Sequence, residues 1–329
     1  MIADVEAELR AAWSRRGEPA PRHVHCLKFG VADYANPGTA FVFFVFRDQS
    51  AHPSAVAKVA RDAVGDPAVR REVESVRTER AQVGAALAAL IPEPLADGEM
   101  NGRAFGAWTA LGGTLDLHHV AGARGARGAE TRIAAALAFL RDVQRATPAA
   151  PVSALEWIGS WDSVRAELAA AGSTAEVLET LAAVAATVWH TAWPAALAHG
   201  DFFPGNILFD AGRVSGVVDW ATVLPRAPIW LDPLGYELSF ALHALLVGRG
   251  AETYERRATA GLRPFAAYGA GLAAAGVDVG WGSAARLLTV VAGAVREMRA
   301  GVARRGVAAL WLRLLELEAR DCAAGRRPE

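Results

Sequence analysis

Residues 198–208 read AHGDFFPGNIL, and residues 214–220 read VSGVVDW. An acid, Asp201, lies in a turn between two apolar runs, and Asn206 follows it by five residues. A second acid, Asp219, ends the β-rich run that comes after Asn206. Phosphoryl transfer needs this set of groups, because one carboxylate orients the attacking hydroxyl while an amide and a second carboxylate hold Mg²⁺. Hard oxygen ligands suit Mg²⁺, which usually takes one or two carboxylates besides phosphate oxygens and water.

This arrangement resembles the aminoglycoside phosphotransferase family, which comprises small-molecule kinases with the protein-kinase-like fold. The residues that carry the resemblance are His199-Gly200-Asp201, Asn206 and Asp219. Their spacing is similar to the protein-kinase pattern H-R-D-x-x-x-x-N followed by D-F-G. Glycine stands here in place of the arginine, and Asp219-Trp220 stands in place of Asp-Phe-Gly.

The resemblance implies an α+β, protein-kinase-like fold with two lobes. The N-terminal lobe, residues 1–111, would bind the nucleotide through an antiparallel sheet and one long helix. The C-terminal lobe, residues 112–329, would be larger and mostly helical, and would provide catalysis and the acceptor site. The resemblance extends over residues 23–245 and is strongest between residues 199 and 219.

Length and composition narrow the class of protein. The chain has 329 residues, 53% of them hydrophobic, which is enough for two lobes and a sizeable core. A net charge of −1, with arginines and acids interspersed, excludes a basic nucleic-acid-binding surface. No uncharged apolar run reaches membrane-spanning length, and the acidic N-terminus is unlike a secretory signal. Cys26 and Cys322 suggest neither a disulfide framework nor a metal site, so we expect a cytoplasmic protein. We also expect a monomer or a homodimer.

Hydrophobic periodicity and turn residues predict the order of the elements. We expect helices at residues 3–15, 67–90, 130–147, 153–171, 173–189, 233–248, 254–275, 283–300 and 305–322. We expect strands at residues 23–30, 39–47, 55–60, 92–95 and 102–108, with a candidate phosphate-covering turn at 31–38. Ser173 and Glu176 fit a capping box, and Ser283 fits an N-cap. Asp232 either caps the helix that follows it or, as in the family, holds the site together.

Lys58 lies in an apolar strand and is one of only two lysines in the chain. A lysine in such a strand needs a partner unless it extends to solvent from a sheet edge. In the family that the motif resembles, this lysine binds nucleotide phosphates and pairs with a helical glutamate. Glu72, Glu74 and Glu79 are the candidates for that pairing. We take Glu72, and the resemblance then assigns Lys58 and Glu72 to the nucleotide site.

Residues 109–113, TALGG, are expected to form the hinge between the lobes, because the two glycines allow a sharp turn. In the family the backbone of this segment binds the nucleotide base. The resemblance therefore assigns Trp108, Thr109 and Leu111 to the nucleotide site. Thr109 stands where many relatives carry glutamate, so the backbone would recognise the base. ATP is the expected nucleotide, GTP stays an alternative, and Mg²⁺ is the expected metal.

The function that the resemblance implies is phosphorylation of a hydroxyl group on a small molecule. Asp201 would orient the hydroxyl and accept its proton, and Asn206 and Asp219 would hold Mg²⁺. Lys58 would neutralise charge on the phosphates. Such a site works mainly by positioning and electrostatics.

Two other classes of function are weighed against this one. A protein kinase would need a long peptide-docking segment after Asp219 that ends in Ala-Pro-Glu, and the run from Trp220 to Leu231 lacks both. A non-catalytic pseudokinase would have lost Lys58 or one of the three motif residues, and all four are present.

The charge of the region expected to bind the acceptor bears on the substrate class. Between residues 225 and 300 the acids are Asp232, Glu237, Glu252, Glu255, Asp278 and Glu297. The bases there are Arg226, Arg249, Arg256, Arg257, Arg263, Arg286, Arg296 and Arg299. The aromatic residues are Trp230, Tyr236, Phe240, Tyr254, Phe265, Tyr268 and Trp281, most of which are expected to be core. Without an acidic excess a polycationic acceptor would lose its electrostatic attraction, so we expect a neutral or weakly charged hydroxyl compound.

Overall fold

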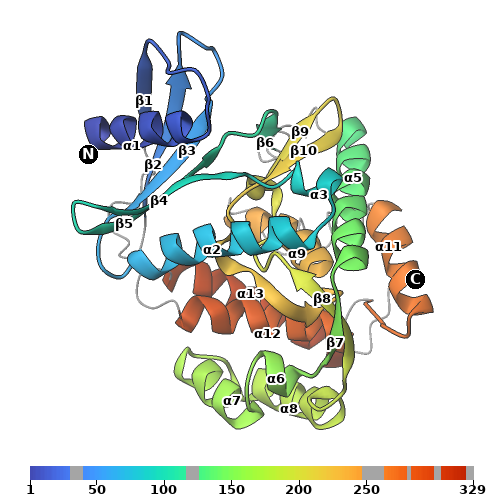
Figure 1. The fold of residues 1–329 in the computed structure, drawn as a ribbon. Helices are drawn as coiled ribbons and strands as arrows, with labels where there is room; N and C mark the ends of the chain where they lie inside the picture. The colour runs from blue at the N-terminus through green and yellow to red at the C-terminus, as the bar shows by residue number, and fades with distance from the viewer. Residues whose placement is uncertain (30–39, 116–125, 247–262, 280–282, 300–304, 324–329) are drawn as a thin grey trace. The chain divides into compact units, whose positions relative to one another are not determined.

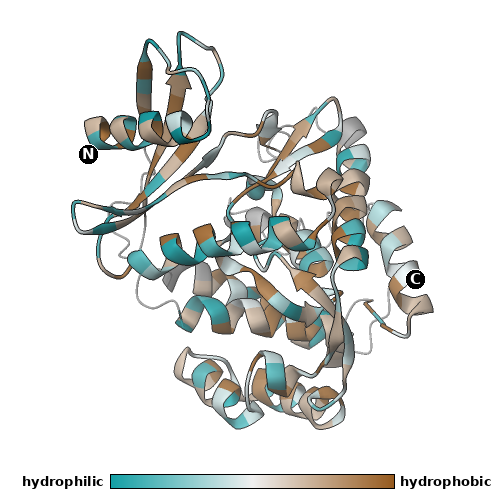
Figure 2. Ribbon diagram, in the orientation of Figure 1, coloured by the Kyte–Doolittle hydropathy of each residue, from teal (hydrophilic) through white to brown (hydrophobic). Residues whose placement is uncertain are grey.

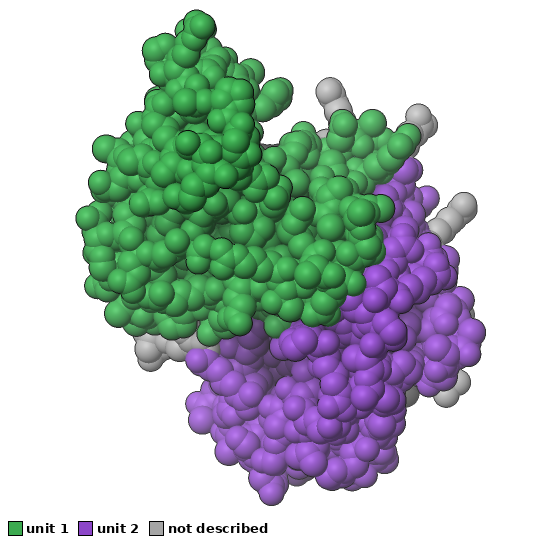
Figure 3. Space-filling model, in the orientation of Figure 1, with its two compact units in different colours: residues 1–115, 206–223 green, residues 116–205, 224–329 purple. Residues whose placement is uncertain are grey.

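The computed structural model describes residues 1–29, 40–115, 126–246, 263–279, 283–299 and 305–323 (Figure 1). The chain divides into two compact units, which Figure 3 shows in different colours. The first consists of residues 1–115 and 206–223, and the second of residues 116–205 and 224–329. An antiparallel sheet dominates the N-terminal region and helices dominate the remainder, which confirms the expected fold class. The segment 206–223 groups with the first unit, a feature that a single boundary after residue 111 does not include.

A five-stranded antiparallel sheet with the order β1-β2-β3-β5-β4 forms the first unit. Its strands are β1 (Val24–Phe29), β2 (Ala40–Arg47), β3 (Ala55–Ala60), β4 (Pro94–Met100) and β5 (Arg103–Thr109). Asn101 and Gly102 both have positive φ and close the β4–β5 hairpin, as a two-residue hairpin turn requires. The expected turn at residues 31–38 lies outside the described residues.

Two helices pack on this sheet. Helix α1 (Ile2–Arg15) buries Leu9 and Trp13 in a cluster with Phe43 of β2. Helix α2 (Asp66–Gln82) has an apolar face, and Figure 2 shows hydrophilic and hydrophobic residues mixed along it. The expected helix over 67–90 is too long, because the chain becomes extended at Val83 before a short helix α3 (Ala85–Ala88). Gly84 after Val83 disfavours a continuous helix.

A small second sheet completes the first unit, with the order β10-β9-β6. Its strands are β6 (Thr114–Leu115), β9 (Ile207–Asp210) and β10 (Arg213–Val217), followed by a 3₁₀ turn, η2 (Trp220–Thr222). Because β6 pairs with β9, the end of the first chain segment is hydrogen-bonded to the strand that follows Asn206. This pairing explains why residues 206–223 belong to the first unit.

The second unit combines helices with a three-stranded sheet in the order β11-β8-β7. The strands are β7 (Pro148–Val152), β8 (Trp193–Ala198) and β11 (Leu224–Pro228). The helices are α5 (Ala126–Ala146), α6 (Ala154–Trp157), α7 (Trp161–Ala170), α8 (Ala175–Val188), α9 (Leu231–Leu246), α11 (Arg263–Ala274), α12 (Ala284–Arg299) and α13 (Arg305–Ala323). Apolar residues of α8, α9, α12 and α13 share one core cluster. No helix in the described part of the chain is both long and apolar enough to cross a membrane.

Several expected boundaries in this unit are wrong. The helix expected over 153–171 is two helices, separated at Gly159, whose φ of 115° is unfavourable for other residues. The capping box occurs at Ser153 and Glu156 rather than at Ser173. Helix α8 is instead capped by Thr174, whose hydroxyl accepts the N–H of Val177 at 3.4 Å. Ser283 caps α12 as expected, accepting the N–H of Arg286 at 3.3 Å.

Candidate functional site

Lys58 contacts two carboxylates of the first unit. Its Nζ lies 2.7 Å from Glu72 Oε2 and 2.9 Å from Glu72 Oε1, and 3.0 Å from Asp219 Oδ1. Of the three candidate glutamates, Glu72 therefore pairs with Lys58, while Glu74 is exposed on the same helix. Glu79 is buried, and its Oε2 has no hydrogen-bond partner among the described residues.

Lys58, Glu72 and Asp219 form one charged cluster, in which Lys58 and Glu72 are shielded from solvent. The side chains of Lys58 and Glu72 are 18% and 7% exposed. Burial would lower the pKa of Lys58, but the carboxylates of Asp219 and Glu72 outweigh it and hold that pKa above its ordinary value. Burial also raises the pKa of Glu72, and the Lys58 ammonium opposes this shift. The cluster therefore presents a permanent cation flanked by two acids, with Asp219 reaching solvent through a side chain that is 46% exposed.

Asp219 has a strained backbone conformation. Its φ of 65° and ψ of 60° lie in the left-handed region, which residues other than glycine adopt only where the surrounding structure requires it. The β9–β10 hairpin provides that requirement, because Val217 pairs with Ile207 and the Val218 N–H donates to the Asn206 carbonyl at 2.9 Å. Asn206 and Asp219 consequently lie at the same end of one hairpin.

This end of the hairpin offers the ligands that Mg²⁺ prefers, an amide oxygen from Asn206 and a carboxylate from Asp219. The described residues contain no group of three or more histidine, cysteine, aspartate or glutamate side chains that could hold a metal. A metal at Asn206 and Asp219 would therefore take its remaining ligands from phosphate oxygens and water. The two residues fit a magnesium ion that arrives with a nucleotide, and they do not form a closed metal site.

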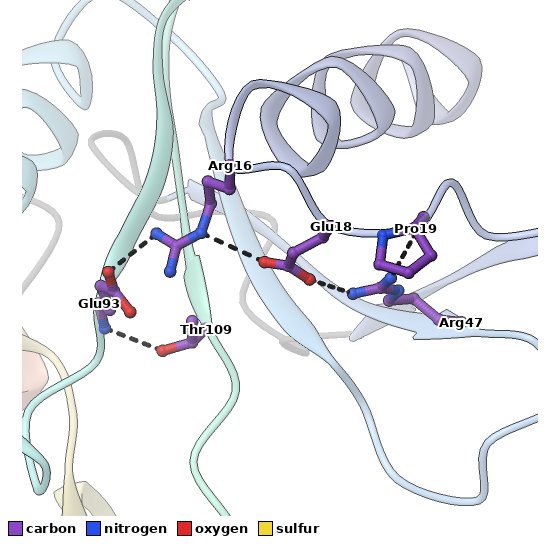
Figure 4. A network of polar contacts seen from close by, with 6 residues as sticks. All are labelled: Arg16, Glu18, Pro19, Arg47, Glu93 and Thr109. Carbon is purple, nitrogen blue, oxygen red and sulfur yellow. Dashed lines mark hydrogen bonds and ion pairs between the residues drawn. The ribbon is translucent and has the colours of Figure 1, made fainter.

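Thr109, in the segment expected to be the hinge, is bound to Glu93, the residue before β4, through two polar groups. Its N–H donates to the Glu93 carbonyl at 2.8 Å, and its hydroxyl accepts the Glu93 N–H at 2.9 Å (Figure 4). The N–H of Ala110 donates to the Ser54 carbonyl at 3.1 Å. A backbone donor to a nucleotide base would thus come from Leu111 onward, and not from Thr109.

A chain of ion pairs leads from this point to the end of α1 (Figure 4). Arg16 lies 2.8 Å from Glu93 Oε1 and 3.2 Å from Glu18 Oε1. Glu18 also pairs with Arg47 at 2.6 Å, and the Arg47 guanidinium lies 4.6 Å from the centre of the Trp13 ring. Most of these side chains are about one-third exposed, so each pair contributes about 0–1 kcal/mol. We assign them no role in chemistry.

Of the other two residues assigned to the nucleotide site, Trp108 is buried in the first unit and Leu111 is half-buried. Trp108 is 3% exposed, and its ring centre lies 6.0 Å from Lys58 Nζ. Its indole N–H is buried and has no hydrogen-bond partner among the described residues. Leu111 packs on β10, where a Cβ at Gly216 would lie 2.5 Å from Leu111 Cδ1. Ser215, which the sequence pattern did not single out, donates to the Gly112 carbonyl at 2.7 Å and so binds the segment 109–113 to β10.

Asp201 belongs to the second unit, in the loop after β8. The carboxylate of Asp232 binds this loop by accepting the N–H of His199 at 2.6 Å and the N–H of Gly200 at 2.9 Å. The Asp201 N–H in turn donates to His199 Nδ1 at 3.3 Å. Asp232 is buried, and burial raises its pKa in spite of the two backbone hydrogen bonds. Helix α9 begins at Leu231, so Asp232 stabilises the loop rather than serving as the N-cap.

Many charges between residues 225 and 300 are neutralised internally. Arg286, 2% exposed, pairs with Glu237 at 3.0 Å and with Glu318 at 2.8 Å. Arg226 pairs with Glu156 and Arg299 with Glu167. Counting charges along the sequence therefore overstates the charge available to an acceptor.

Of the aromatic residues of this region that the structure describes, Trp230 and Tyr236 are core, whereas Phe240, Phe265 and Tyr268 are half-buried, so fewer are core than expected. Trp230 and Tyr236 are fully buried, and Tyr236 contacts the rings of Phe202, Phe240 and Phe265. The Tyr268 hydroxyl donates to the Gln144 side chain, while Tyr254 and Trp281 lie outside the described residues.

The chain is similar to known phosphotransferases. The profile of the phosphotransferase enzyme family matches residues 38–273 of the chain. No curated protein sequence matches the chain. Among solved structures, a thermostable mutant of aminoglycoside phosphotransferase APH(4)-Ia in its apo form is 17% identical, with a TM-score of 0.57 over 98% of this chain and 100% of the other.

Two further structures show bound nucleotides. A mutant of the same enzyme in a ternary complex with AMP-PNP and hygromycin B is 17% identical, with a TM-score of 0.57 over 97% of this chain and 98% of the other. Aminoglycoside phosphotransferase APH(2'')-Ib with bound ADP is 16% identical, with a TM-score of 0.52 over 96% of this chain and 99% of the other. At these identities the likeness shows that the fold is shared.

Proposed function

Because the chain belongs to the phosphotransferase enzyme family, we propose that it is a kinase that transfers the γ-phosphoryl group of ATP to a hydroxyl of a small molecule. The observation that carries the proposal is the position of Lys58, whose ammonium contacts both Glu72 and Asp219. This contact places a cation suited to phosphate oxygens beside a carboxylate suited to magnesium. Such an arrangement favours catalysis by electrostatic stabilisation of the transferred group.

Each residue of the first unit has a distinct task in this proposal. Lys58 binds phosphate oxygens, and Glu72 keeps its ammonium in place from α2. Asn206 and Asp219 hold Mg²⁺, which supplies positive charge to the β- and γ-phosphates when it is bound. The open side of Asp219, with nearly half of its side chain exposed, is what allows it to reach a nucleotide-bound ion.

Asp201 provides the base in the second unit. It accepts a hydrogen bond from the acceptor hydroxyl and takes its proton as the bond between the hydroxyl oxygen and the γ-phosphorus forms. The bond between the γ-phosphorus and the β–γ bridging oxygen breaks, and ADP leaves. Asp232 contributes by fixing the backbone of the loop that carries Asp201.

The nucleotide and the acceptor class are the remaining parts of the proposal. AMP-PNP and ADP in the similar structures support ATP over GTP. For the acceptor, we keep a neutral or weakly charged hydroxyl compound, such as a macrolide-like natural product or a sugar derivative. Support comes from the lack of an acidic excess between residues 225 and 300, where Arg286 and Arg299 are paired with Glu237 and Glu167.

A screen of acceptors tests the proposal. The protein is incubated with Mg·ATP and with matched panels of aminoglycosides, macrolides, sugars and other neutral hydroxyl compounds. ADP release is followed by a coupled assay, and mass spectrometry detects the phosphate adduct. We expect an adduct on a neutral hydroxyl compound. Efficient phosphorylation of aminoglycosides alone would contradict the acceptor class, and ADP release without any adduct across the panels would contradict the kinase assignment.

A further inference from the structure

Arg296, in the last turn of α12, reaches the loop that carries Asp201. Its Nη1 donates to the carbonyl oxygen of Gly200, and its Nη2 lies 3.4 Å from Asp201 Oδ1. Both groups belong to the second unit, although 95 residues separate Arg296 from Asp201 in the chain. One guanidinium therefore contacts the main chain next to the proposed base and the side chain of the base itself.

A buried acid holds Arg296 in this orientation. Glu297, 1% exposed, accepts from Arg296 Nε at 3.1 Å and lies 3.0 Å from Arg296 Nη2. The planar guanidinium is thus bound at its Nε edge by Glu297 and at its tip by the loop. A planar group with several fixed donors loses little freedom for each hydrogen bond that it forms, which suits it to hold another group in one direction.

The same loop is also bound by Asp232. That carboxylate accepts the N–H groups of His199 and Gly200, whereas Arg296 donates to the Gly200 carbonyl. Gly200 has a φ of 78°, a conformation that glycine adopts without strain. The backbone before Asp201 is consequently fixed by the Asp232 carboxylate and the Arg296 guanidinium.

We propose that Arg296 is a positioning residue, which orients the carboxylate of Asp201 toward the acceptor hydroxyl. The inference rests on the proposed function, because Arg296 acts only by orienting Asp201, the proposed base. The hydroxyl proton passes to Asp201 as the oxygen–phosphorus bond forms, so the carboxylate must already point at the hydroxyl. A shift of about 1 Å in such a group can cost about 100-fold in rate.

The test compares Arg296→Met with Arg299→Met. Arg299 is a matched control, because it lies three residues further along α12 and pairs with Glu167 at 2.9 Å. Mg·ATP is the probe, with water as the acceptor and phosphate release as the signal. The measurements are kcat, KM for Mg·ATP and Tm, made on the full chain in the wild-type and Asp201→Asn backgrounds.

We expect Arg296→Met to lower kcat by roughly 10- to 100-fold with an unchanged KM for Mg·ATP, since the effect is on orientation and not on nucleotide binding. Arg299→Met should keep the wild-type kcat. In the Asp201→Asn background Arg296→Met should have no further effect, because the residue acts through Asp201. Arg296→Lys should restore part of the rate, since an ammonium supplies a point charge but not a planar fork.

Different results would overturn different claims. If Asp201→Asn is impaired but Arg296→Met has the same kcat as Arg299→Met, the inference about Arg296 is wrong and the proposed function stands. If Arg296→Met is equally harmful with and without Asp201, its role is structural. If Asp201→Asn itself keeps full phosphate release, the proposed base is wrong, and the role of Arg296 falls with it. Should Arg296→Met fold poorly by Tm, the comparison of Arg296→Lys with Arg299→Lys decides in the same way.

Discussion

Lys58 Nζ lies 3.0 Å from Asp219 Oδ1, although 161 residues separate the two in the chain. The contact forms because residues 206–223 pack with the N-terminal sheet, so that the hairpin ending at Asp219 belongs to the same unit as β3. The phosphate-binding cation and the metal-binding acid of the proposal are therefore parts of one compact unit. The consequences of this contact can be measured.

The ion pair between Lys58 and Glu72 should be needed for phosphate alignment. Glu72→Gln keeps the shape of the side chain but removes its charge, so we expect kcat/KM to fall by about 10- to 100-fold while the fold is retained. Glu74→Gln, on the exposed side of the same helix, should have no effect. In a double-mutant cycle with Lys58→Met, coupling of about 0.5–3 kcal/mol is expected for Glu72. Coupling to Glu74 in its place would refute the pair.

Asp219 should make nucleotide binding depend on magnesium. The informative change is Asp219→Asn, because asparagine tolerates the left-handed backbone conformation that Asp219 adopts. Calorimetry with AMP-PNP should show that Mg²⁺ strengthens binding to the wild type and has little effect on the variant. Asp210→Asn, an exposed change in the same hairpin, should behave as the wild type. If Asp219→Asn binds Mg·AMP-PNP with the affinity of the wild type, the assignment of Asp219 as a metal ligand is wrong.

Glu79 should make stability depend on pH. Burial raises the pKa of Glu79 to about 7, above the value of about 4.3 for an unfolded chain. Between these values the folded state binds more protons than the unfolded state, so stability falls as pH rises through that window. Above pH 7 the folded state bears the full free-energy cost of an ionised, buried Glu79. Glu79→Gln should therefore raise Tm at pH 8 by about 2–4 °C, as about 1 kcal/mol does in a domain of this size, and by less at pH 5.

Thermal unfolding of both proteins at the two pH values is the measurement for Glu79. Glu74→Gln is the control, because that side chain is exposed and should give no pH-dependent difference from the wild type. An increase in Tm for Glu79→Gln that is larger at pH 5 than at pH 8 would have the wrong sign.

Asp232 should be required for the geometry of the Asp201 loop. Asp232→Asn offers a single carbonyl oxygen, so one of the N–H groups of His199 and Gly200 loses a buried acceptor, at a cost of about 1–3 kcal/mol. We expect a lower Tm and a lower kcat with an unchanged affinity for Mg·AMP-PNP. Asp162→Asn, an exposed acid at the start of α7, is the control. An unaltered kcat in Asp232→Asn would show that the loop does not depend on this acid.

Local patterns in the sequence predicted the elements that carry the first half of the site. Alternation of small and β-branched residues located β3 with its observed bounds, and the Asn101-Gly102 pair located the β4–β5 turn. Motif spacing singled out Asp219, whose strained backbone and contact with Lys58 are now visible. The strand, the turn and the motif spacing depend on residues near one another in the chain, so they can be predicted from short stretches of sequence.

Features set by tertiary contacts could not be predicted from sequence patterns. Strand β7, which begins with Pro148, was not predicted, and it lies at the edge of its sheet, where proline is tolerated. Asp232 could not be assigned between capping and loop binding, because both roles use a carboxylate as an acceptor of backbone N–H groups. No sequence pattern indicated a role for Arg296, because 95 residues separate it from Asp201 in the chain.

The most direct test of the account is the effect of Asp201→Asn on phosphoryl transfer. Single-turnover reactions with γ-labelled ATP, Mg²⁺ and the acceptor found by the screen measure the chemical step, and calorimetry with AMP-PNP measures nucleotide binding. We predict a loss of roughly 10²- to 10⁴-fold in the rate of transfer, the usual contribution of a general base, with nucleotide affinity and Tm unchanged. Transfer at the full wild-type rate by Asp201→Asn would contradict the assignment of Asp201 as the base.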